Sequence, residues 1–345
     1  MKSIRITGVA LAGLASIALM SGCAAGTNGT SLDLVNQVDE SAQTPIETLA
    51  ASLGAPVVPA DAKLCYITRT ISNEFWGYER SGFEAEATAL GIKYSTFAVT
   101  DESSITEQLD KAKTAMNQGC TALLASPISA TGLDTVFSDA ISKGIPVIIL
   151  NDARGNVPGV VYIGPDAHAI GLTAADYIAS QLPDGGEVAM IEGDPGSSNA
   201  VNRGIGFKDG LKNHSNLSLV ASQTAMWDQT KAQDIATAML TAHPNIKAFY
   251  SQNDGMGLGV QAAIAAKGLT GKVLLVGTDG IPQAKSQISA GGYTATVSER
   301  PTTEGKTGVD AALWLLAGKK LPGWIDVPAV LIDKTNVDQY PTGMP

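Results

Sequence analysis

The fold is decided by residues 63–99, KLCYITRTISNEFWGYERSGFEAEATALGIKYSTFAV. An apolar run of strand type is followed by a polar stretch, an amphipathic helix expected over 83–90, and a second run of strand type. Apolar strands joined by helices are typical of parallel sheets covered by helices on both faces. Phe75 and Trp76 lie in the polar stretch, where two adjacent aromatic side chains need an explanation.

The same alternation continues almost to the end of the chain. Strands are expected at 63–68, 92–99, 121–126, 146–150, 160–164, 187–193, 217–225, 246–252, 272–280 and 293–299, with helices between them. About 280 residues take part in this pattern, which is enough for two domains of ordinary size. We therefore predict an α/β protein with two Rossmann-like lobes, each built on a parallel sheet.

The first residues predict export. Residues 1–22 have the charges, apolar stretch and small residues of a signal peptide, and LMSGC resembles a bacterial lipobox with Cys23 as the lipidated residue. An ordinary secretory signal with an incidental cysteine is the alternative. Residues 23–60 are rich in small and polar residues and are interpreted as a flexible tether, within which residues 44–53 are able to form a short helix. The expected location is the outer face of the cell membrane, or the periplasm.

The amino-acid composition limits the kinds of ligand and partner that the protein can bind. The net charge is −10, and the chain after the tether has no run of Lys and Arg. The sequence therefore lacks the basic surface that nucleic-acid binding requires, and we expect no nucleic-acid partner. Cys65 and Cys120, which begin two expected strands, form a disulfide if those strands are neighbours, or remain buried thiols. The three histidines do not cluster along the sequence, so we expect neither a metal nor a cofactor.

Polar and aromatic side chains follow the expected strands. In parallel sheets ligands bind outside the carboxyl ends of the strands, which selects Arg69, Asn73, Phe75, Trp76, Ser126, Asn151, Asp152, Arg203, Trp227, Asn253, Asp279 and Glu299. Aromatic rings pack on the C–H faces of a sugar, while Asp, Asn and Arg pair with its hydroxyls. Phe75 and Trp76 are expected to face such a ligand. The alternative is a hydrophobic staple against the following helix.

Several segments resemble the ribose-binding branch of the periplasmic sugar-binding proteins, which are type I receptors of ABC importers. The resemblance runs from about residue 63 to residue 334 and includes NEFWGYERSGFEAEATALG, NRGIGFKDGL and LTAHPNIKAFYSQNDGMGLGVQAAI. It implies a periplasmic binding protein type I fold with a three-segment crossover hinge. The implied lobes are 61–165 with 300–327, and 166–299 with 328–340.

The resemblance also implies roles for particular residues. Asn73, Asn253 and Asp279 match polar contacts of the family, Phe75, Trp76 and Trp227 match stacking aromatics, and Arg203 matches an arginine that grips sugar hydroxyls. The chain departs from the ribose pattern at Asn151-Asp152, where Asp-Arg is usual, at Arg69, and at Glu299, which replaces Gln. These departures argue against simple ribose. A pyranose, a cyclitol or a sugar alcohol is expected instead, and a sugar acid, bound through Arg69 and Arg203, is a further alternative.

The sequence thus predicts a monomeric, lipid-anchored receptor that delivers a small sugar or polyol to an ABC permease and is not an enzyme. A receptor of the same fold that reports to a chemoreceptor or membrane kinase, or binds a non-sugar ligand, is the alternative. A dehydrogenase needs a dinucleotide-binding fingerprint, which the sequence lacks. A repressor of the lactose type needs an N-terminal basic helix-turn-helix, where this chain has an export signal.

Overall fold

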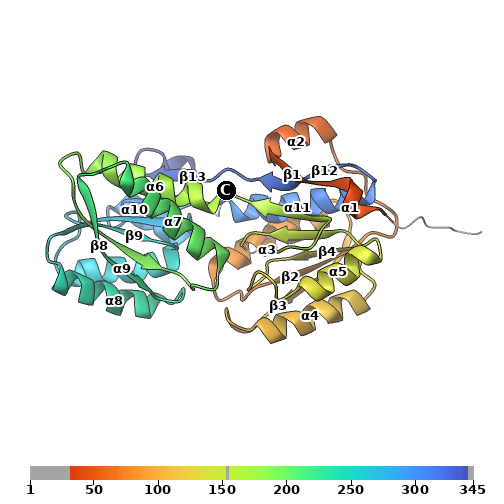
Figure 1. Ribbon diagram of the computed structural model, residues 1–345, viewed down its shortest axis with the longest axis horizontal. Coiled ribbons are helices and arrows are strands. Elements are labelled where there is room, and N and C mark those ends of the chain that lie inside the picture. Colours follow the sequence, from red (N-terminus) through yellow and green to blue (C-terminus); the bar gives the residue numbers. More distant parts are fainter. Residues whose placement is uncertain (1–31, 153–154, 341–345) are drawn as a thin grey trace, which may run out of the picture. The chain divides into compact units, whose positions relative to one another are not determined.

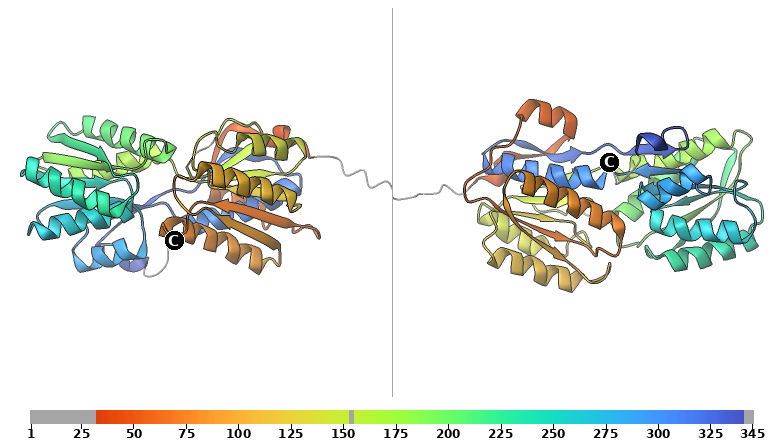
Figure 2. Two further views of the ribbon diagram at one scale, coloured as in Figure 1. Left: turned by 90° about the horizontal axis from the view of Figure 1, so that it is seen from below. Right: turned by 180° about the vertical axis from the view of Figure 1, so that it is seen from behind.

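The computed structural model describes residues 32–152 and 155–340. They form two sheets, each covered by helices on both faces (Figures 1 and 2). The first sheet has seven parallel strands in the order β1-β12-β6-β5-β4-β2-β3. Its strands are β1 (Val38–Pro45), β2 (Lys63–Thr68), β3 (Lys93–Ala98), β4 (Ala122–Ala125), β5 (Val147–Leu150), β6 (Val160–Gly164) and β12 (Leu321–Asp326).

The second sheet has six strands in the order β13-β11-β10-β9-β7-β8 and is parallel except for β13. Its strands are β7 (Gly186–Glu192), β8 (Leu217–Thr224), β9 (Ile246–Ser251), β10 (Leu274–Asp279), β11 (Ala295–Ser298) and β13 (Val330–Asp333). Because the chain leaves one sheet for the other after β6, after β11 and after β12, three segments connect the two sheets. The predicted α/β fold with a three-segment crossover is confirmed.

Each sheet and the helices packed on it are called a lobe here. The first lobe carries α3 (Glu74–Ala89) against α11 (Pro301–Leu316) on one face, and α4 (Ile105–Asn117) with α5 (Asp134–Ser142) on the other. The second lobe carries α6 (Ala167–Gln181) with α7 (Ser198–Lys212), α8 (Gln229–Ala242) with α9 (Asp254–Ala266), and α10 (Pro282–Ala290). A 3-10 turn, Val337–Gln339, follows β13. Buried apolar strand residues fill the space between each sheet and its helices.

The N-terminal segment differs from the predicted tether. Residues 34–53 form α1 (Leu34–Gln37), β1 and α2 (Ile46–Leu53), and β1 pairs with β12 as an edge strand of the first sheet. The polar composition concealed this strand, because most of its side chains point to solvent and only Val38 is buried. The interpretation of 23–60 as a flexible tether is therefore wrong for 34–45, whereas the short helix expected within 44–53 is confirmed as α2. The predicted signal peptide and Cys23 lie outside the described residues.

Helix α3 begins earlier than expected. Asn73 caps its N-terminus by accepting a hydrogen bond from the Phe75 backbone N–H, so Phe75 and Trp76 belong to the first helical turn. The expected start at residue 83 was too late, because the apolar pattern is interrupted by side chains that contact the other lobe. Tertiary contacts, rather than amphipathic periodicity, account for the aromatic pair in this turn.

Cys65 and Cys120 are joined by a disulfide, with Cα atoms 5.8 Å apart. The two residues come together because β2 and β4 are hydrogen-bonded neighbours in the first sheet. Such a bond fits an oxidising compartment, in which disulfides persist. Among the residues that the structure describes, no helix is long and apolar enough to cross a membrane.

Candidate functional site

A cavity lies between the lobes, at the carboxyl ends of the strands. This is the position at which parallel α/β sheets hold their ligands. Its walls combine three aromatic rings with amides, carboxylates and two guanidinium groups. The lining residues are Arg69, Asn73, Phe75, Trp76, Glu102, Asn151, Asp152, Asn199, Arg203, Trp227, Asn253, Asp279 and Glu299.

The aromatic side chains form apolar surfaces in this polar cavity. Phe75 and Trp76 make an edge-to-face pair with ring centroids 4.8 Å apart, and both belong to an apolar cluster that includes residues of the second lobe. The Trp76 indole donates to Glu102 over 3.0 Å and lies under the Arg69 guanidinium. Its orientation is therefore fixed before any ligand arrives.

Trp227 supplies the aromatic surface from the second lobe. Its ring lies directly over Gly193, since a Cβ at that glycine would come within 2.2 Å of the ring. The backbone of Trp227 is left-handed, with φ 63°, a conformation that non-glycine residues rarely adopt. The close approach and the unusual backbone together place the indole on the cavity wall.

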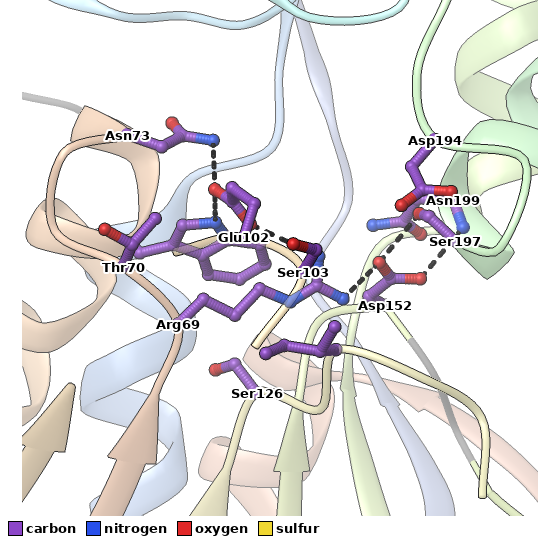
Figure 3. Close-up of polar contacts among 12 residues, drawn as sticks. Arg69, Thr70, Asn73, Glu102, Ser103, Ser126, Asp152, Asp194, Ser197 and Asn199 are labelled. Carbon is purple, nitrogen blue, oxygen red and sulfur yellow. Dashed lines mark hydrogen bonds and ion pairs between the residues drawn. The ribbon is translucent and has the colours of Figure 1, made fainter. Parts of the chain in front are cut away.

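One polar network crosses from the first lobe to the second (Figure 3). The Arg69 guanidinium donates to Asp152 over 2.5 Å and to the Pro127 carbonyl, and Asp152 in turn accepts from the Ser197 hydroxyl and the Asn199 backbone N–H. Asp152 is 5% exposed and lies after β5, whereas Ser197 and Asn199 begin α7. The network therefore joins the two lobes beside the cavity and satisfies a buried carboxylate.

Arg203 and Glu299 form a second buried ion pair. The Arg203 guanidinium also donates to the Gln252 carbonyl over 2.7 Å, but its Nε donor has no hydrogen-bond partner in the described residues. Burial opposes the charge of Arg203, but the nearby negative charges, of which Glu299 contributes most, together raise the pKa of the guanidinium. The unpartnered Nε gives a ligand oxygen in the cavity a charged donor.

Asn151 links the cavity to the interior of the first lobe. Its amide nitrogen lies 3.1 Å from a Glu299 oxygen and 3.1 Å from a Glu304 oxygen, and its carbonyl oxygen accepts from the Asn199 amide. Glu304 is fully buried and faces Glu79 across the α3–α11 contact. Burial and the nearby Glu79 and Glu299 charges raise the pKa of Glu304 well above its usual range.

Asp279 and Asn253 complete the second-lobe wall. Burial and the nearby negative charges of Glu299 and Asp254 raise the pKa of Asp279 well above its usual range. Its backbone is left-handed, with φ 115°. The following residues, Gly280 and Ile281, donate their backbone N–H groups to the Asp254 carboxylate over 2.8 and 3.1 Å. Asp254 therefore fixes the strained turn that presents Asp279 to the cavity.

Left-handed backbone recurs at this cavity. Asn151 and Asp152 have φ values of 51° and 50°, and they join Trp227 and Asp279 as lining residues in this region. Such conformations cost about 1–3 kcal/mol each and cluster at ligand sites. The chain thus accepts unfavourable backbone in order to hold these side chains in position.

The structure brings eleven of the twelve predicted residues together on the cavity wall. Ser126 is the exception: it is fully buried below the cavity, where its hydroxyl donates to Glu79 and contacts the Tyr66 hydroxyl. Sequence reasoning missed Glu102 and Asn199. Glu102 follows β3 in a polar turn, and Asn199 lies in the first turn of α7 after β7, so the strand-end rule applied more widely would have found both.

The architecture and the cavity define a class of protein that encloses one small polar molecule between two Rossmann-like lobes. The periplasmic binding protein domain model matches residues 64–320. The chain belongs to this family, whose members are binding proteins.

Its relatives bind sugars and polyols. The D-allose-binding periplasmic protein of Escherichia coli is 39% identical over 260 residues, covering 72% of this chain and 83% of the relative. The ribose import binding protein of Salmonella typhimurium is 30% identical over 286 residues, covering 83% of this chain and 95% of the relative.

Solved structures agree with these relatives. An ABC transporter solute-binding protein from Actinobacillus succinogenes with bound D-allose aligns with a TM-score of 0.78 and 27% identity, covering 81% of this chain and all of that one. The Caulobacter myo-inositol-binding protein with bound myo-inositol aligns with a TM-score of 0.74 and 27% identity, covering 82% and 97%.

Proposed function

We propose that this protein is an extracytoplasmic receptor that captures one small sugar or polyol between its lobes and delivers it, chemically unchanged, to an ABC importer. Residues 61–165 with 300–327 would move as one lobe, and residues 166–299 with 328–340 as the other. Closure by hinge motion would enclose the ligand.

The observation that carries this proposal is the pairing of flat apolar surfaces with planar charged groups in one cavity. Phe75, Trp76 and Trp227 offer ring faces, while Arg203 and Asp279 offer a charged donor and a carboxyl group. A sugar or cyclitol ring presents C–H faces to aromatic rings and hydroxyls that both donate and accept. Relatives that bind D-allose and myo-inositol support a six-membered ring or a similar polyol.

The same proposal covers location and partners. Lipid chains on Cys23, at about 0.8 kcal/mol for each buried methylene, would hold the receptor at the membrane surface. The residues between Cys23 and α1, which begins at Leu34, would connect the lipid anchor to the first lobe. The receptor would work as a monomer that docks on an ABC permease.

A thermal-shift screen tests the ligand class, using the mature chain against D-allose, D-ribose, myo-inositol, xylitol and a set of amino acids and nucleosides. A ligand at 100 times its Kd adds about 2.7 kcal/mol to the free energy of unfolding, so a hexose or cyclitol should raise Tm by several degrees. Titration calorimetry on the hits gives Kd and stoichiometry. A screen in which only amino acids or nucleosides raise Tm would refute the sugar assignment.

A further inference from the structure

Two buried carboxyl groups meet in the contact between α3 and α11, behind the cavity wall. Glu79 on α3 and Glu304 on α11 are both fully buried. The helices approach closely because glycines lie at their contact: a Cβ at Gly82 would come within 2.1 Å of the Thr302 carbonyl oxygen, and one at Gly305 within 2.0 Å of the Glu79 carbonyl oxygen. This close approach brings the two side chains together, so that each carboxyl group shifts the pKa of the other.

Among the described residues, no Lys, Arg or His forms an ion pair with either carboxyl group. One Glu79 oxygen accepts hydrogen bonds from the Tyr66 and Ser126 hydroxyls, and the other oxygen has no partner in the described residues. The positive charge of Arg69 acts on Glu79, but Arg69 is already paired in the network of Figure 3. A Glu304 carboxyl group that keeps its proton supplies the missing donor. Because two adjacent buried carboxyl groups cannot both be ionised, the pair retains at least one proton.

One amide group connects this pair to the cavity. The Asn151 side chain donates to Glu304 and to Glu299 over 3.1 Å each, and Glu299 lines the cavity. On α3, Phe75 lies one turn before Glu79 and lines the same cavity. A ligand that contacts this part of the wall is therefore separated from the pair by a single hydrogen-bonding residue.

Besides Arg69, the described titratable groups around the pair are phenols and carboxyl groups. Tyr66 faces Glu79 from β2, and the charge of Glu304 acts on Tyr162 of β6. Burial raises the pKa of both phenols well above their usual range, so they keep their protons at neutral pH. Burial also raises the pKa of Glu79 to about 7 and that of Glu304 well above its usual range. The pair therefore loses its first proton near pH 7 and keeps the second.

A bound ligand would increase the cost of a negative charge on the pair. A sugar ring displaces water from Glu299, and the Glu299 charge then acts on Glu304 through a less polar medium. We propose, on the basis of the sugar-binding function above, that Glu79 and Glu304 form a proton-binding site linked to the cavity and that the pair takes up a proton when the sugar binds. The proton comes from the solvent, so the receptor holds its sugar more tightly at acidic than at alkaline pH.

Titration calorimetry in two buffers of different ionisation enthalpy counts the protons directly. The mature chain is titrated with D-allose and with myo-inositol, in phosphate and in imidazole at pH 7. The wild type should take up about 0.3 to 1 proton for each sugar bound. Because the slope of log Kd against pH equals this number, Kd should rise at least threefold between pH 6 and pH 8.

Matched variants assign the proton to the pair. The double variant Glu79→Gln with Glu304→Gln keeps the shape of both side chains and removes both titrating groups. Its proton uptake should vanish, and its Kd should stay within twofold from pH 6 to pH 8. Asp310→Asn removes another carboxyl group of α11, whose pKa burial raises to about 6, and should leave the proton uptake unchanged.

The outcomes separate this linkage from the proposed function. Sugar binding by the wild type without proton uptake between pH 6 and pH 8 would overturn the linkage and leave the receptor function standing. Uptake that persists in the double variant would place the proton on another group, such as Asp279, and would also overturn it. If neither probe binds the wild type at any pH, the six-membered-ring ligand is wrong and the linkage fails with it.

Discussion

Replacing Arg203 with methionine separates two tasks of its guanidinium group. The group neutralises the buried Glu299 carboxylate, and its unpartnered Nε is the donor that we expect to bind a ligand oxygen. A hydrogen bond to a charged group contributes about 1.5–3 kcal/mol. Arg203→Met should therefore raise the Kd of the sugar found in the screen about 10- to 150-fold.

The same substitution leaves Glu299 buried without its cation. Removing one partner of a buried ion pair costs about 3–5 kcal/mol, although the hydrogen bond from the Asn151 amide moderates the loss. Urea unfolding of the ligand-free protein measures this cost. The double variant Arg203→Met with Glu299→Gln should recover most of the stability, because no uncompensated charge remains, but it should still bind at least tenfold more weakly.

Calorimetry and urea unfolding test the two tasks of the guanidinium group separately. Calorimetry showing an unchanged Kd for Arg203→Met would remove the guanidinium from the binding site. Urea curves in which the double variant is no more stable than Arg203→Met would show that the buried Glu299 charge is not the source of the cost. Circular dichroism should confirm that both variants retain the α/β fold.

Three further predictions follow from the contacts around the cavity. Asp254→Ala leaves the two backbone donors after Asp279 unpaired, so ligand affinity should fall at least tenfold, whereas Asp254→Asn keeps an acceptor and should bind nearly normally. Burial raises the pKa of Glu79 to about 7. Because the unfolded carboxyl titrates near 4.5, its stability contribution is complete below that pH and should be lost as pH rises through 7. The loss is on the order of 3 kcal/mol, and Glu79→Gln should flatten the profile. Reduction of the disulfide, which closes a loop with a sequence separation of 55, should lower the free energy of unfolding by roughly 4 kcal/mol.

Each of these predictions has its own measurement. Calorimetry on the two Asp254 variants would contradict the positioning role if both bound the ligand equally. Urea unfolding between pH 4 and 9 would contradict the Glu79 prediction if Glu79→Gln and the control Glu187→Gln gave parallel profiles. Coincident unfolding curves with and without dithiothreitol would show that the disulfide contributes little.

Local sequence signals were sufficient to predict most strands and helices of the two lobes and most residues of the cavity wall. Strands such as β2 and β9 are apolar runs bounded by polar turns, so their type and ends were readable from the sequence. The residues after them could be grouped because the carboxyl ends of parallel strands meet at one edge. That rule selected Arg203, Trp227 and Asp279 without any knowledge of distances.

The elements that the sequence did not predict depend on contacts with residues that are remote in the sequence. Strand β1 is polar and exposed, and only its pairing with β12, more than 280 residues later, makes it a strand. The start of α3 was hidden because Phe75 and Trp76 pack against the other lobe rather than along their own helix.

Which strand-end residues face the cavity was likewise decided in three dimensions. Ser126 and Asn151 both follow strands of the first sheet, yet Ser126 lies beneath the cavity and Asn151 on its wall. The left-handed backbone of Asn151 and its neighbour turns these side chains toward the second lobe. The periodicity of apolar residues was enough to predict the layers of sheet and helix, because it reflects which side chains of each element are buried. The site and its ion pairs required the two lobes to meet, because burial and charge compensation there depend on both.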